Sequence, residues 1–117
     1  MAKILSVSYD EALLTTRQKI LERRGHSVTS ACGLQDALQL CMSNAPFDLF
    51  IVGHSIPHGE KQALISHFRA NHPDEPVVAL KRYGEQQVEG ASLLIEPNPG
   101  ELVRAVDGLV SGKDAGA

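Results

Sequence analysis

Two kinds of hydrophobic pattern alternate along the chain. Short apolar runs predict β-strands at residues 4–7, 28–31, 49–52, 77–80 and 93–95. Between these runs, apolar residues recur every three or four positions, which is typical of the buried face of a helix. The helical groups are Leu13, Leu14, Ile20 and Leu21; Leu34, Leu38 and Cys41; Leu64, Ile65 and Phe68; and Leu102, Val103, Val106, Leu109 and Val110.

Capping residues mark the ends of two predicted helices. Asp10 can accept hydrogen bonds from the first turn of the first helix, and Gly25 can end that helix. The run 98–101 offers a capping Asn, Pro at the first helical position, and Glu three residues after the cap. We therefore expect the first helix to begin after Asp10 and the last after Asn98.

Strand and helix alternate five times, which predicts a doubly wound α/β fold. The last three strands are continuously apolar, so we expect helices over both faces of a parallel sheet. Right-handed crossovers favour the strand order 2-1-3-4-5 of a flavodoxin-like, three-layer sandwich. Residues 81–90 leave room for one or two helical turns, so the fourth helix should be shortened. One domain should span residues 1–112, followed by a flexible tail over 113–117.

Composition narrows the function classes. The 117 residues carry a net charge of −3, which argues against a generally basic nucleic-acid binder. No apolar run approaches the roughly 20 residues that a membrane-spanning helix needs, and no signal peptide is recognisable at the start. Cys32 and Cys41 have no metal-ligand spacing and are expected to be small core residues. We expect a cytoplasmic protein that binds neither membranes nor nucleic acid directly.

In a doubly wound fold, ligands gather at the carboxyl ends of the strands. The residues that follow the first, third, fourth and fifth strands are Ser8, Tyr9 and Asp10; Gly53, His54 and Ser55; Lys81 and Arg82; and Glu96 and Pro97.

Several short motifs, in order and spacing, resemble the receiver domain of two-component response regulators over about residues 3–110. They are Lys-Ile-Leu-Ser-Val at 3–7, Phe-Asp-Leu-Phe-Ile-Val at 47–52, Ile-Pro at 56–57, Pro-Val-Val-Ala-Leu at 76–80, Gly-Ala at 90–91, and Pro97. The resemblance implies a receiver-like fold and a role in two-component or phosphorelay signalling. It also implies a cis peptide bond between Glu96 and Pro97.

The residues that perform the chemistry of that family are replaced. The two acids that hold Mg²⁺ in a receiver fall, by the resemblance, on Ser8 and Tyr9. The phosphoacceptor Asp falls on Gly53, the switch Ser or Thr on Lys81, and the Lys after the fifth strand on Glu96. All five positions depart from the pattern, so the chain resembles a degenerate receiver that lacks the phosphoacceptor.

The chemistry of these residues agrees with that interpretation. Mg²⁺ prefers carboxylate oxygens, and phosphoryl transfer needs a nucleophile, which Gly53 does not have. The sequence offers no nucleophile–base pair, no paired carboxylates and no cofactor fingerprint. We therefore predict no catalytic residue, no cofactor and no enzyme activity.

Lys81 and Arg82 add positive charge at this edge, and two interpretations stay open. With His54 they could bind a small anion. Alternatively, Lys81 and Glu96 form an ion pair that seals a non-functional pocket, and Arg82 is solvated.

His54 and His58 are four residues apart, a spacing that binds zinc on a helix. Here Pro57 lies between them in an expected loop, and no third ligand is close in sequence, so we predict no metal site.

Two functions from different classes follow. The first is a signalling module that binds a protein partner without aspartyl phosphorylation; a second copy of the chain is one candidate partner. The second is a sensor of a small anionic ligand that uses Lys81, Arg82 and His54.

Overall fold

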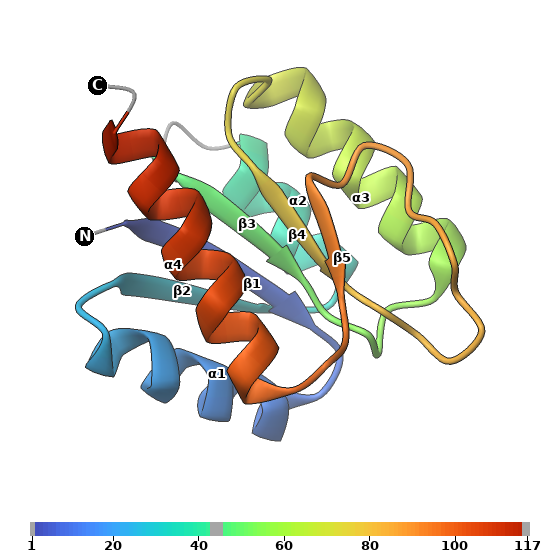
Figure 1. The fold of residues 1–117 in the computed structure, drawn as a ribbon. Coiled ribbons are helices and arrows are strands. Elements are labelled where there is room, and N and C mark those ends of the chain that lie inside the picture. Colours follow the sequence, from blue (N-terminus) through green and yellow to red (C-terminus); the bar gives the residue numbers. More distant parts are fainter. Residues whose placement is uncertain (1, 43–45, 116–117) are drawn as a thin grey trace.

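The computed structural model describes residues 2–42 and 46–115. Its centre is a five-stranded parallel sheet with the order β2-β1-β3-β4-β5, as predicted (Figure 1). The strands are β1 (Lys3–Ser8), β2 (Ser27–Cys32), β3 (Leu49–Val52), β4 (Val77–Leu80) and β5 (Leu93–Ile95). The apolar runs chosen from the sequence therefore coincide with the strands to within one residue at each end.

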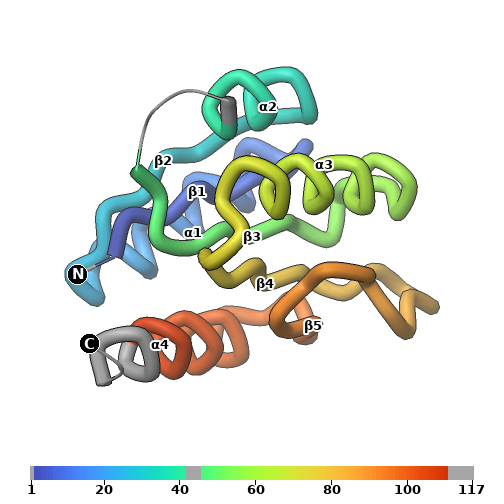
Figure 2. Tube along the Cα trace, turned by 90° about the horizontal axis from the view of Figure 1, so that it is seen from above, coloured from blue at the N-terminus to red at the C-terminus, as the bar shows by residue number. Residues whose placement is uncertain are grey.

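Four helices cover the sheet: α1 (Glu11–Arg23), α2 (Leu34–Met42), α3 (His58–Asn71) and α4 (Pro99–Ala115). Helices α2 and α3 lie on one face and α4 on the opposite one, as Figure 2 shows. Each face has its own apolar core. Phe50 stacks on Phe68 of α3 with ring centroids 4.1 Å apart, whereas Ile51 packs in the other core with Leu21 of α1 and Val106 of α4.

The predicted helix caps are confirmed. The Asp10 carboxylate accepts hydrogen bonds from the N–H groups of Ala12 (2.9 Å) and Leu13 (3.2 Å). The Asn98 side chain accepts one from the N–H of Glu101 at 2.8 Å. Both caps lie at the carboxyl edge of the sheet, so they also fix the loops that border it.

The connection between β4 and β5 differs from the prediction. The expected short fourth helix is absent, and residues 81–92 form turns and irregular backbone instead. Strand β5 is consequently less covered than expected: Leu93 is 39% exposed, although its run is as apolar as those of the fully buried β3 and β4. A continuous apolar run does not by itself distinguish a central strand from a short edge strand. The predicted boundary between a domain over 1–112 and a tail over 113–117 stays a prediction, because residues 116 and 117 lie outside the described residues.

Candidate functional site

The parallel register brings the five positions that the sequence resemblance singled out to one edge of the sheet. Val7 of β1 pairs with Val52 of β3, and Leu80 of β4 pairs with Ile95 of β5. The residues that come directly after two paired strands therefore lie next to each other at this edge. Gly53 N–H donates to the Val7 carbonyl at 2.8 Å, and Lys81 N–H to the Ile95 carbonyl at 2.8 Å, which extends the pairing into the loops.

Ser8 is fully buried and joins two loops. Its hydroxyl lies 2.7 Å from the hydroxyl of Ser55 and accepts a hydrogen bond from the Asp10 N–H at 3.1 Å. The Ser55 hydroxyl also accepts one from the Tyr9 N–H at 3.0 Å. These neutral contacts satisfy the polar atoms at a position where the resemblance places a metal-binding acid.

The Tyr9 side chain contacts α3 and the residue after β2. Its hydroxyl donates to the carboxylate of Glu60 on α3, and its ring lies over Gly33, the residue after β2. The hydrogen bond to Glu60, together with burial and the negative charge of Glu60, raises the pKa of Tyr9. Tyr9 therefore ties two loops together and adds no metal ligand to the edge.

Gly53 has no room for a side chain. A Cβ on Gly53 would lie 2.9 Å from Nη1 of Arg17 and 2.9 Å from the carbonyl oxygen of Val7. The first contact is with the end of a side chain, but the second is with the backbone of the neighbouring strand. A carboxylate at this position would need the local backbone to shift.

Arg17 of α1 fills the space above Gly53, and sequence reasoning missed it. The residue is 94% buried, since only 6% of its surface is exposed. Nη2 lies 3.1 Å from Nδ1 of His54, while Nη1 has no hydrogen-bond partner in the part of the chain that the structure describes. The signal was present: Arg17 is four residues after Leu13 and three before Ile20, so it falls on the apolar face of the helix.

His54 lies among cations. Burial and the positive charges of Arg17, Lys61 and Arg82 lower its pKa, against a smaller opposing effect of Asp10. The imidazole is therefore neutral near pH 7. Because a guanidinium can only donate, Nδ1 is the acceptor from Arg17, and the ring proton resides on Nε2.

Lys81 and Glu96 lie 3.8 Å apart, but this ion pair is exposed at both ends. Such a pair contributes about 1 kcal/mol or less. It does not close the edge, because an open depression remains there. The depression is lined by His54, Lys81, Arg82, Tyr83, Gly84, Glu96 and Pro97.

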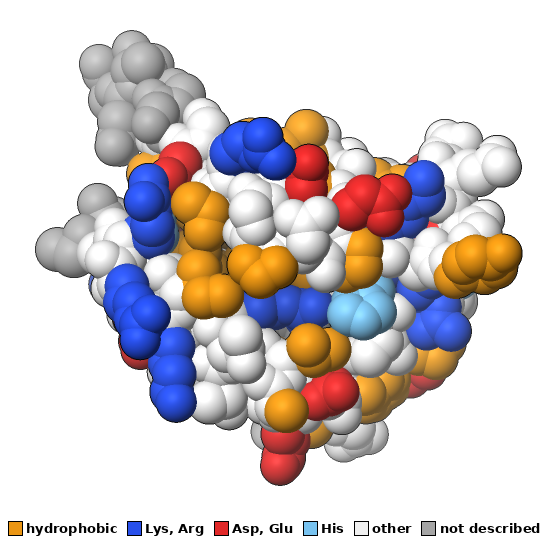
Figure 3. Space-filling view, turned by 60° about the horizontal axis from the view of Figure 1, so that its bottom comes forward, with side chains coloured by type: hydrophobic (Ala, Val, Ile, Leu, Met, Phe, Trp, Pro, Cys, Tyr) orange, Lys and Arg blue, Asp and Glu red, His pale blue; other side chains and the backbone are white. Residues whose placement is uncertain are grey.

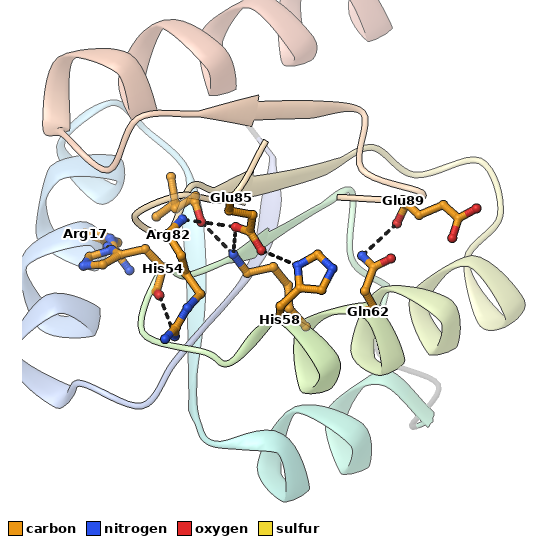
Figure 4. A network of polar contacts seen from close by, with 9 residues as sticks. Arg17, His54, His58, Gln62, Arg82, Glu85 and Glu89 are labelled. Carbon is orange, nitrogen blue, oxygen red and sulfur yellow. Dashed lines mark hydrogen bonds and ion pairs between the residues drawn. The ribbon is translucent and has the colours of Figure 1, made fainter. Parts of the chain in front are cut away.

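A second polar cluster holds the β4–β5 connection against α3 (Figure 4). Lys61 of α3 is fully buried, and its ammonium donates to the Leu80 carbonyl at 2.8 Å and to the Glu85 carboxylate at 2.7 Å. The other Glu85 oxygen lies 2.6 Å from Nδ1 of His58. Burial raises the pKa of Glu85, but hydrogen bonds from His58, Lys61 and the Arg82 N–H outweigh it and lower the pKa to about 2.

The two histidines considered for a metal serve different partners. Nδ1 of His54 contacts Arg17, whereas Nδ1 of His58 contacts Glu85. Among the described residues, no group of three or more His, Cys, Asp or Glu side chains could hold a metal ion. The expectation that no metal binds here stays a prediction.

The prediction of a cis peptide bond between Glu96 and Pro97 is wrong, since the described chain contains no cis bond. The trans isomer is the favoured form of an X–Pro bond. The Glu96 carbonyl accepts a hydrogen bond from the Asn98 N–H at 2.9 Å, so the backbone turns at Pro97 before Asn98 caps α4.

No model of a known protein family matches the sequence, and no curated protein sequence matches it. Solved structures are similar to it over most or all of its length. A response regulator receiver domain protein from Clostridium thermocellum has a TM-score of 0.86 at 20% identity, with 100% of both chains covered. A CheY-like receiver domain protein from Methanospirillum hungatei has a TM-score of 0.84 at 22% identity and covers 100% of this chain and 99% of its own.

A third similar structure is the response regulator TrrA from Thermotoga maritima, solved in complex with Mg²⁺–BeF. Its TM-score is 0.81 at 20% identity, with 93% of this chain and 99% of that chain covered. Within the described residues, no helix is long and apolar enough to cross a membrane. The strand order, the helix positions and these similarities agree that the chain has the fold of the receiver domains of response regulators.

Proposed function

We propose that this chain is a receiver-like signalling module that acts through protein–protein contact without aspartyl phosphorylation, and that it is not an enzyme. The observation that carries the proposal is the closure of the acceptor position. Arg17 and the Val7 carbonyl leave no space for a carboxylate at Gly53, and Ser8 and Tyr9 supply no acid for Mg²⁺.

Surface features support a protein partner. Tyr83, at the turn of the β4–β5 connection, is fully exposed, and Leu93 of β5 is partly exposed nearby in the chain. Aromatic side chains that are exposed in this way often anchor protein interfaces. The buried Lys61–Glu85 pair holds this connection in place, so the exposed residues are presented from a fixed segment.

The first experiment tests the phosphorylation half of the proposal. The protein is incubated with acetyl phosphate or beryllofluoride and Mg²⁺, and intact mass and amide chemical shifts are measured. We expect no covalent adduct and no Mg²⁺-dependent shifts around residues 8, 53 and 81. TrrA, which was solved with Mg²⁺–BeF, is the positive control. A hydroxylamine-labile phosphate adduct would contradict the proposal.

The second experiment tests the interaction half. The tagged chain is used to capture partners, and the captured proteins are identified by mass spectrometry. A Tyr83→Ser variant should lose a stoichiometric partner, whereas a Glu22→Ser variant, also exposed but on α1, should retain it. Equal capture by both variants would argue against this surface.

A second candidate function, the sensor of a small anion, is favoured by one specific observation. Arg17 is a buried cation beside His54, the histidine already expected to take part in such a site.

A further inference from the structure

We propose that Arg17, Arg82 and Lys81 form a binding site for a small oxyanion, a carboxylate or a phosphate, at the carboxyl edge of the sheet. The inference rests on the second candidate function and deepens it, because it names the ligand class and adds Arg17, to which the family resemblance gives no role.

Three parts of the chain bring Arg17, His54 and Arg82 together (Figure 4). Arg17 comes from α1, His54 from the loop after β3, and Arg82 from the β4–β5 connection. Nη2 of Arg17 contacts the His54 ring at 3.1 Å, and Nη1 of Arg82 donates to the His54 carbonyl at 3.2 Å. Lys81 lines the same depression as His54 and Arg82. Arg17 therefore contacts the ring of His54, and Arg82 contacts its backbone carbonyl.

The unpartnered Nη1 of Arg17 is the strongest indication of a ligand. A buried donor without a partner destabilises the folded state, and more so when it is charged. The helix could have carried an apolar residue here, as it does at Leu14 and Leu21. A guanidinium matches the paired oxygens of carboxylates and phosphates, and such charge-assisted hydrogen bonds are among the strongest in proteins.

The site is reached from the open depression. His54 lines that depression and its ring contacts Arg17, which lines a neighbouring cavity; Pro97 lines both hollows. An oxyanion in the depression would meet Arg82 and Lys81, and its contact with Arg17 would require the half-buried His54 ring to move. Figure 3 shows a basic side chain and a histidine side by side on this face, with hydrophobic side chains around them.

The balance of charge favours an anion. Arg17, Lys81 and Arg82 are opposed here by Asp10 and Glu96. Asp10 is occupied as the cap of α1, and Glu96 is 3.8 Å from Lys81 with 64% of its side chain exposed, so a ligand can displace it. An acid-lined receiver site attracts Mg²⁺, whereas this site has the opposite charge and should repel it.

Binding should be coupled to the protonation of His54. The charged groups that face His54 are Arg17 on α1, Lys61 on α3, Arg82 on the connection, and Asp10 at the start of α1. Glu85 already pairs with Lys61, so among the charged groups that face His54 the two arginines are opposed by Asp10 alone. A bound anion would offset their charge and raise the pKa of His54, so affinity should increase as pH falls.

The test uses two probes at constant ionic strength, inorganic phosphate and acetate, with chloride as the reference salt. Amide shifts and the His54 imidazole titration are followed by NMR. We expect saturable shifts at residues 53–55 and 81–82, and a raised pKa of His54. Arg17→Met and Arg82→Gln should each weaken binding about tenfold or more. Arg23→Met, an exposed arginine on the same helix, should leave binding unchanged.

The outcomes separate the alternatives. Saturation by phosphate alone would assign a phosphate group, and saturation by acetate alone would assign a carboxylate. Absence of saturable shifts with both probes up to about 50 mM would overturn the proposal, and so would unchanged affinity in Arg17→Met. If Arg17→Met does not fold, Arg82→Gln and Lys81→Gln decide. Binding that leaves partner capture unchanged would support the site but contradict the sensing role, so the two can fail separately.

Discussion

Two buried cations, Arg17 and Lys61, stand in opposite situations. Both sit in the middle of an apolar helix face, on α1 and α3. The ammonium of Lys61 is bonded to a carboxylate and to a strand-end carbonyl, whereas Arg17 has one neutral histidine and a donor without a partner. Lys61 therefore fixes the structure, and Arg17 carries hydrogen-bonding capacity that the described chain does not use.

The consequence of the difference is local. The ammonium of Lys61 donates to Oε1 of Glu85. The same oxygen accepts a hydrogen bond from the Arg82 N–H at 3.1 Å. The connection that replaces the expected fourth helix is thus held by the buried Lys61–Glu85 pair, by hydrogen bonds from Arg69 to the Gly90 carbonyl, and by Val88 in the core. Arg17 supports no comparable segment. Substitutions at Arg17 and at Lys61 should therefore change the free energy of unfolding by very different amounts.

Lys61→Met should have the largest effect on stability. It leaves the Glu85 carboxylate, only 5% exposed, without its buried ammonium partner. Removing one member of a buried pair costs roughly 4 kcal/mol. Urea unfolding followed by circular dichroism measures the free energy of unfolding. Lys19→Met, an exposed lysine on α1, is the control and should change it little. Equal effects of the two substitutions would remove the structural role given to Lys61.

Acid should weaken the same pair. The pKa of Glu85 is about 2 in the folded protein, whereas the ordinary pKa of a Glu side chain is 4.5. Because the folded value is the lower one, the stabilisation is complete above pH 4.5 and is lost as pH falls toward 2. The shift corresponds to about 3 kcal/mol. Of the decrease in unfolding free energy between these pH values in the wild type, about that amount should come from Glu85.

A variant that replaces both partners, Lys61→Met with Glu85→Leu, is the control for the acid effect. This variant should lose less stability over the same pH range, since the titrating carboxylate is gone. An identical pH dependence in both proteins would place the acid sensitivity elsewhere.

Gly53→Ala tests how firmly Arg17 is held. The added methyl would meet Nη1 of Arg17 and the Val7 carbonyl, and overpacking of this kind costs about 2 kcal/mol. Gly59→Ala on α3 is the matched control, because a Cβ there would meet nothing within 4 Å. Thermal unfolding of the two variants gives the comparison. No loss in Gly53→Ala would mean that the edge adapts easily and that the acceptor position is not closed.

The fold was predictable from the sequence because local patterns determine most of it. The runs at 49–52, 77–80 and 93–95 coincide with β3, β4 and β5, and the caps at Asp10 and Asn98 are where their side-chain chemistry placed them. The helical period also puts Arg17 and Lys61 on inward faces, but no role was predicted for either residue. A charged residue on such a face can be interpreted only through its partner.

Those partners are distant in sequence. Glu85 is 24 residues from Lys61, and His54 is 37 residues from Arg17. Neither pairing follows from a local period, because both depend on how two loops fold over the edge of the sheet. The β4–β5 connection shows the same limit, since its length excluded a full helix but did not reveal the buried ion pair that orders it.

Arg17→Met should have the smallest effect on stability and the most informative effect on His54. Replacing a poorly partnered buried cation by an apolar residue of similar length should change the free energy of unfolding by no more than about 1 kcal/mol. The pKa of His54 should rise, because burial remains but the adjacent positive charge is removed. An NMR titration of the imidazole measures this shift, and Arg23→Met should not cause it. A large loss of stability with an unchanged His54 pKa would mean that Arg17, like Lys61, is a structural cation.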